Sequence, residues 1–267
     1  MQDTITIRTC DDPPVALEAS RAVLAANSKV FADMLAIPTQ AETSTGIDID
    51  ETAAHFKPFL RILNMSHEEG DPLDDLEPED WPVVAKLADK YDSAVAKNFA
   101  LAKCWKWNSS DDDDDKGDPP ARAAAFQTAA ILGEPHLAKV FLFEVLENPS
   151  KSEIDLALRG RRAEFTVWVE LLKDLVLKMS VADPPNTPDC AVCKSGGARH
   201  SYELAWRRAM SETLRSWRPY CVAEPFGASA ALAVALSDMC RKCKWAFKRM
   251  SASSSEEYRN EAPDFPL

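Results

Sequence analysis

A run of five consecutive aspartates, Asp111–Asp115, followed by Pro119-Pro120, is the feature that most constrains how this chain folds. Neighbouring like charges repel one another, and a segment without apolar side chains cannot offset the entropy of folding by burial. Residues 109–120 are therefore predicted to form an extended acidic linker between two folded parts. A calcium loop is the alternative, but the run lacks the glycine and the distal glutamate of such a loop.

The length and composition agree with two folded parts inside the cell. A chain of 267 residues is long enough for two domains. We expect a domain at 1–108, a helical region at 121–250 and a flexible tail at 251–267. No apolar run reaches the ~18 residues of a membrane span, and residues 1–8 lack the features of a signal peptide. We therefore expect a cytoplasmic or nuclear protein without a membrane partner.

The charge of the chain is unevenly distributed. The net charge of −12 disfavours a general role in coating nucleic acid or an anionic membrane. Residues 1–120 hold 11 basic and 25 acidic side chains, whereas residues 190–250 hold 11 basic and 4 acidic ones. A local contact of the C-terminal region with nucleic acid stays open as an alternative.

Signals for strands and helices alternate in the N-terminal part. Thr4–Arg8 alternates β-branched and other side chains, and a turn-forming Asp-Asp-Pro-Pro segment separates it from Val15-Ala16-Leu17, which predicts a β-hairpin. Ser20 and Ser28 are suited to cap two short helices, the second of which carries Phe31 and Met34 on its apolar face. Further elements are predicted as a strand at 47–49 and as helices beginning at Thr52, Asp80 and Val95.

This order of elements, and several residues within it, resembles the BTB/POZ domain. Leu17–Phe31 is similar to the family's central stretch, in which an apolar residue and a helix reading vLaa-S-F follow one another. Ile47-Asp48-Ile49, followed by Phe56 and Phe59-Leu60, is similar to the next strand and helix of the family. Ala88-Asp89-Lys90-Tyr91 is similar to its A-x-K-Y helix.

The resemblance covers roughly residues 3–107 and implies an α+β domain that binds other proteins. Members of the family commonly self-associate, and many of them link substrates to a cullin ubiquitin ligase. Ser20 stands where the family usually has a histidine. Because only Met1, Gln2 and Asp3 precede the first strand, we expect any homodimer to form through helical faces, without exchange of an N-terminal strand. The predicted function is a non-catalytic interaction adaptor.

Apolar residues beyond the linker recur at spacings of three and four, which predicts an all-helical C-terminal region. We expect helices at 121–132 and 137–146, and a longer one that carries Phe165, Trp168 and Met179. A second break at 183–188 is rich in proline. The apolar residues that mark two later helices are Tyr202, Trp206, Met210 and Trp217, and then Leu232, Leu236 and Phe247.

Four of the seven cysteines form two Cys-x-x-Cys pairs, Cys190/Cys193 and Cys240/Cys243. The odd total of seven cysteines and the expected reducing compartment argue against a disulfide framework. Gly196-Gly197 follows the first pair, as in a zinc knuckle, and a helical spacing of three places the second pair on one face. Four thiolates would complete a closed tetrahedral zinc site with a structural role.

Two other interpretations of these cysteines stay open. Cys240 and Cys243 continue the apolar face of a predicted helix, and free cysteine is common in protein cores. The 46 residues between the pairs exceed the usual spacing of zinc fingers, and His200 or Cys221 are substitute ligands. A thioredoxin-like role requires a strand-helix-strand pattern that this part of the sequence lacks.

The sequence contains no recognisable catalytic motif. It has no phosphate-binding loop, no Gly-x-Gly-x-x-Gly and no Gly-x-Ser-x-Gly, and its four histidines stand alone in sequence. We therefore expect the protein not to be an enzyme, although a hydrolase or redox centre assembled in three dimensions is an alternative. A second alternative is a transcription-related scaffold, in which Trp206, Trp217 and Trp245 and the cations around them contact nucleic acid instead of packing in a core.

Overall fold

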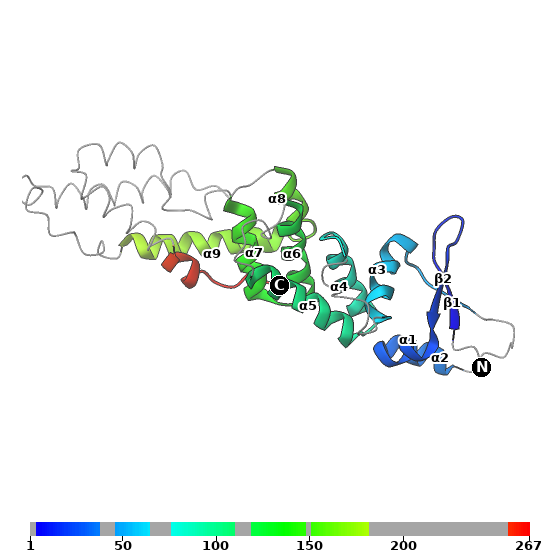
Figure 1. Ribbon diagram of the computed structural model, residues 1–267. Coiled ribbons are helices and arrows are strands. Elements are labelled where there is room, and N and C mark those ends of the chain that lie inside the picture. Colours follow the sequence, from blue (N-terminus) through cyan, green and yellow to red (C-terminus); the bar gives the residue numbers. More distant parts are fainter. Residues whose placement is uncertain (1–3, 38–45, 65–75, 110–118, 148–150, 182–255) are drawn as a thin grey trace, which may run out of the picture. The chain divides into compact units, whose positions relative to one another are not determined.

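The computed structural model describes residues 4–37, 46–64, 76–109, 119–147, 151–181 and 256–267 (Figure 1). The chain divides into two compact units, one formed by residues 1–142 with Leu267 and the other by residues 143–266. The described residues are mostly helical and include a three-stranded mixed sheet, which makes the fold α+β at this coarse level. Among these residues, no helix is long and apolar enough to cross a membrane.

Three short strands form the sheet of the first unit: β1 (Thr4–Arg8), β2 (Ala16–Ser20) and β3 (Gly46–Asp48), in the order β2-β1-β3. β1 pairs antiparallel with β2 and parallel with β3, where Ile7 lies opposite Ile47. Successive side chains of a strand point to opposite faces, so Ile5 and Ile7 are buried together while their neighbours are more exposed. The predicted hairpin and the short strand are confirmed.

Two serine caps begin the helices α1 (Arg21–Asn27) and α2 (Lys29–Ala36). The Ser20 hydroxyl accepts a hydrogen bond from the Val23 N–H at 3.4 Å, and the Ser28 hydroxyl accepts one from the Phe31 N–H at 3.2 Å. Such caps satisfy backbone donors that have no partner within the helix. Both predicted caps are confirmed.

The Asp11 carboxylate ties the turn between β1 and β2 to the start of α3 (Ala53–Leu63). Its Oδ2 accepts hydrogen bonds from the Thr9 hydroxyl at 2.5 Å and from the Ala53 N–H at 2.7 Å. The Thr52 side chain makes no capping hydrogen bond, so Asp11 caps α3 from a distant part of the chain. Hydrogen bonds from Thr9 and then from Ala53 hold the pKa of Asp11 below its ordinary value.

Replacing Asp11 by alanine should lower the midpoint of thermal unfolding at pH 7. It should also make this midpoint decrease less steeply as the pH is lowered. A carboxylate with a lowered folded-state pKa stabilises the fold above its unfolded pKa of 3.8, and this contribution is lost as the pH falls through the folded value. Circular dichroism melts between about pH 2 and 7 measure both effects. Asp33→Ala, which removes an exposed carboxylate from α2, is the control. An Asp11→Ala midpoint that equals the parent's at every pH would contradict the capping role.

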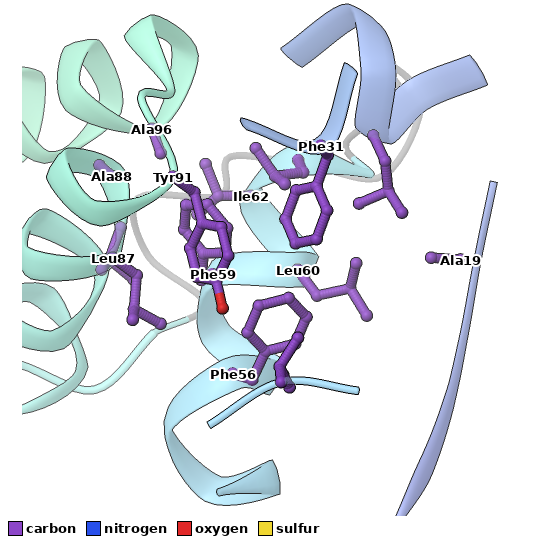
Figure 2. Packing of buried hydrophobic residues seen from close by; sticks show 14 of the residues in the cluster. Ala19, Phe31, Phe56, Phe59, Leu60, Ile62, Leu87, Ala88, Tyr91 and Ala96 are labelled. Atoms are coloured by element: carbon purple, nitrogen blue, oxygen red, sulfur yellow. The ribbon is translucent and has the colours of Figure 1, made fainter. Parts of the chain in front are cut away.

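One cluster of buried apolar side chains joins the sheet to α1, α2, α3, α4 (Asp80–Lys90) and α5 (Ala94–Ser109). Figure 2 shows side chains of α2 and α3 meeting Tyr91 at its centre. Leu24, Phe31, Leu60 and Leu87 are at most 7% exposed, which confirms their predicted place in the core. The Phe31 and Tyr91 rings stack with centroids 4.7 Å apart.

Helix α6 (Pro119–Leu132) packs against α4 and α5, and its Ile131 and Leu132 contact the same cluster. Small side chains explain the close approach, because Ala123, Ala125 and Ala129 of α6 are all buried. The first compact unit therefore extends past residue 108, where we expected the domain to end. Most of the predicted acidic linker, residues 110–118, lies outside the described residues.

The second unit begins at Phe143, within α7 (Pro135–Glu147), and includes α8 (Lys151–Ala157) and α9 (Arg162–Val181). The helices expected at 137–146 and around Phe165 are present, whereas α8 had not been predicted. Residues 256–261 form a helical turn, and Tyr258 and Phe265 are buried. This part of the chain thus differs from the flexible tail expected at 251–267, because its aromatic side chains are in the core of the unit. The remaining predicted helices of the C-terminal region fall on residues outside the described ranges.

Candidate interaction site

The four predicted zinc ligands, Cys190, Cys193, Cys240 and Cys243, lie outside the described residues. The same holds for the substitute ligands His200 and Cys221 and for the tryptophans of the basic region. Among the residues that the structure does describe, no group of three or more His, Cys, Asp or Glu side chains is placed to hold a metal ion. The zinc site stays a prediction from the sequence.

Two free cysteines belong to the described part of the chain. Cys10 is exposed in the turn after β1, whereas Cys104 is buried in α5. Burial is the main cause that raises the pKa of the Cys104 thiol to about 12, with a smaller contribution from the charge of Glu134. A thiol that stays protonated is a poor nucleophile, so Cys104 serves packing.

The α1–α2 pair is held on the core by a set of hydrogen bonds centred on Ser28. Besides capping α2, the Ser28 hydroxyl donates to the backbone carbonyl of Tyr91 at 2.6 Å. The Lys29 N–H donates to the Asp92 carbonyl at 3.3 Å, and the Asn27 side chain donates to the Leu63 carbonyl at 2.9 Å. Three contacts to the ends of α3 and α4 therefore fix the orientation of α1 and α2.

A second set of contacts locks the C-terminal end of α4 beneath this helix pair. The Tyr91 hydroxyl donates to Glu51 Oε2 at 2.5 Å, and the Lys90 ammonium donates to Glu51 Oε1. Burial, followed by the hydrogen bond that the Tyr91 hydroxyl donates to Glu51, raises the pKa of the Tyr91 phenol, which therefore stays neutral. The Phe31 ring packs against both Tyr91 and Phe56, so α2 is anchored by an aromatic side chain as well.

The firmly held helix pair presents apolar side chains to solvent. Met34 of α2 is 36% exposed and Ile37, directly after the helix, is 64% exposed. Ala22 and Ala26 of α1 are also exposed. A surface of this kind, fixed in position before a partner arrives, loses little entropy on binding. We call Met34 and Ile37 with these two alanines the α1–α2 surface.

The exposed Trp105 of α5 is a second apolar feature of the first unit. Its side chain is 50% exposed, and on the same helix the Lys103 ammonium lies 5.4 Å from the centre of the Trp107 ring. Tryptophan is enriched where protein partners contact one another, but a single exposed aromatic ring is also common on ordinary surfaces. The α1–α2 surface is the stronger candidate because several residues contribute to it.

Met34 was predicted on the apolar face of its helix, together with Phe31, and the structure shows that this face is only partly buried. Phe31 is fully buried, whereas Met34, three residues later, lies at the exposed edge of the apolar stripe. The only signal in the sequence is the width of that stripe. The stripe is wider than the part of the helix surface that packing on one side can bury, since it includes Val30, Phe31, Met34 and Leu35.

The chain matches no protein-family model, no curated protein and no solved structure.

Proposed function

We propose that this protein is a non-catalytic interaction adaptor that works through a BTB/POZ-type domain in its first unit. The observation that carries the proposal is the α1–α2 surface, a set of exposed apolar side chains on a helix pair that is fixed to its core. Residues that carry the family resemblance hold this helix pair in place. The Ser28 hydroxyl donates a hydrogen bond to the Tyr91 carbonyl, and the Phe31 ring stacks on the Tyr91 ring.

A second copy of the chain is the partner that we propose for this surface. Met34 and Ile37 leave apolar area in contact with water, and burying it on association is favourable by roughly 25 cal/mol per Å². Methionine is enriched in the cores of protein interfaces. A two-fold dimer would place the surface of one copy against the same surface of the other. The family resemblance further implies a cullin ubiquitin ligase as a binding partner.

Glutamate in place of both Met34 and Ile37 should convert a self-associating chain into a monomer. Two new charges on each side would have to leave water as the interface forms, which costs more than the apolar contact contributes. Sedimentation velocity of the intact protein at about 10–100 µM measures the change, and the dissociation constant should rise at least about a hundredfold. Circular dichroism checks that the double variant is folded.

Val167→Glu is the matched control for this experiment. Val167 is a 55% exposed aliphatic side chain on α9, so the substitution adds one negative charge, in place of the two of the test variant, at a site outside the α1–α2 surface. This variant should associate like the parent. A parent chain that is monomeric throughout the concentration range, or a double variant that associates as the parent does, would remove self-association from the proposal. Binding of the intact chain to a purified cullin tests the ligase role separately.

A further inference from the structure

The last described segment, residues 256–266, contacts the second unit like a bound peptide. After a helical turn at 256–261 the segment is extended, and three side chains spaced by four and three residues are buried: Tyr258, Ala262 and Phe265. Their neighbours in the segment, including Glu257, Glu261 and Asp264, are more exposed. A single helical turn is too short to be stable alone, so its conformation depends on what it contacts.

The receiving site is aromatic and is formed by α7 and α9. The Trp168 ring of α9 lies 5.2 Å from the Phe143 ring of α7 and 6.4 Å from the Phe165 ring, measured between centroids. The Phe265 ring of the segment meets Trp168 edge-on at 5.8 Å, and the Tyr258 ring meets Phe143 edge-on at 6.0 Å. Edge-to-face pairs of this geometry are favourable beyond the area that they bury.

One hydrogen bond adds direction to the aromatic contacts. The Trp168 indole N–H donates to the backbone carbonyl of Pro263 at 2.9 Å, across 95 residues of sequence. A buried indole N–H requires an acceptor, and a peptide carbonyl in this register supplies it whatever the side chain is. In Figure 1 the red segment runs beside α9, as these contacts require.

We propose that Phe143, Phe165 and Trp168 form a peptide-binding site whose resident ligand is the segment 256–266, and that the same segment of a second copy takes its place by exchange. Two aromatic anchors seven residues apart and one main-chain carbonyl define what the site recognises. Exchange between copies preserves every contact, because the incoming segment makes the same ones as the outgoing segment. The resident segment is favoured in dilute solution by its tether to the same chain.

A labelled synthetic peptide of residues 256–267 with blocked ends tests the proposal on the full chain. Phe265→Ala in the chain weakens the resident segment, so this variant should bind the peptide at least about tenfold more tightly than the parent chain does. The same peptide with alanine at both Tyr258 and Phe265 should not bind. Trp168→Phe, added to the Phe265→Ala chain, should weaken peptide binding about fivefold, because it removes the N–H while keeping an aromatic ring. Fluorescence anisotropy measures peptide binding by the parent chain and by both variants, and also the binding of the doubly substituted peptide.

A second experiment keeps the proposal testable if Phe265→Ala disturbs folding. A protease cleavage site placed at residues 251–255 of the otherwise unmodified chain cuts the segment loose after the protein has folded. The freed segment should then exchange with the labelled peptide, while circular dichroism retains the helical signal. A cut segment that never exchanges, or a unit that loses its helices on cutting, would show that residues 256–266 are an inseparable part of the core. Equal and negligible binding by a folded Phe265→Ala variant and the parent would equally overturn the proposal.

Discussion

Replacing Phe31 by alanine should lower the free energy of unfolding of the first unit by about 3–5 kcal/mol. The ring is fully buried, stacks on Tyr91 at 4.7 Å and meets Phe56 edge-on at 6.2 Å. Its removal reduces apolar burial and leaves a cavity between α2, α3 and the end of α4. Because packed cores relax only partly around a cavity, the neighbouring rings cannot close in to replace the packing that Phe31 provides.

Urea denaturation of the intact chain measures this destabilisation, and hydrogen exchange assigns it to residues 4–109. Met34→Ala is the matched control, since Met34 lies on the same helix but is 36% exposed. It should cost less than about 1 kcal/mol, within the range of surface substitutions. If Phe31→Ala were as mild as Met34→Ala, the ring could not be the anchor that seats α2 on the core.

Much of the first unit follows from signals that act over three or four residues. Ser20 and Ser28 cap the helices that follow them because a short hydroxyl side chain reaches the backbone N–H three residues ahead, whatever the rest of the chain does. The alternation in Thr4–Arg8 likewise determines which side chains face the core. The expected hairpin, helix pair and strand therefore agree with the structure.

Contacts between distant residues could not be predicted in this way. Asp11 caps α3 at Ala53, 42 residues away, and the Ser28 hydroxyl bonds the Tyr91 carbonyl across 63 residues. The sequence around Asp11 or Ser28 does not indicate which distant residue it will bond, because that depends on how the helices and strands pack. For the same reason the extent of the first unit was not anticipated: the pattern of residues 121–132 predicted a helix, but nothing in it indicates that this helix, α6, packs against α4 and α5.

The candidate sites show the same division between local and long-range information. Periodicity identified the apolar face of α2, which carries both Phe31 and Met34, but not that Met34 lies at the edge of this face that is exposed to water. Tyr258 and Phe265 lie in the stretch 251–267, which was expected to be a flexible tail. Trp168, which contacts this segment, belongs to a helix that was predicted correctly. The sequence pattern of neither segment indicated that the two would pack together.

The cysteine pairs lead to the last prediction, which rests on the sequence. Protein purified without chelators should carry about one equivalent of zinc, because four thiolates gathered without a metal would either repel one another or stay protonated, whereas a zinc ion offsets their charge. Cys190 and Cys193 would then be tied to Cys240 and Cys243 through the metal. Structural zinc sites contribute directly to folding, so the effect of removing one ligand should be large.

Cys193→Ser should therefore release the zinc and markedly increase hydrogen exchange across residues 190–250, and a chelator should do the same to the parent. The first unit should keep its protection, because its core cluster is formed within residues 5–132. Cys10→Ser, which replaces an exposed cysteine of the first unit, should retain the metal and serves as the control. Clearly less than one equivalent of zinc in the parent, or a Cys193→Ser variant with the parent's stability, would leave these cysteines with a packing role only.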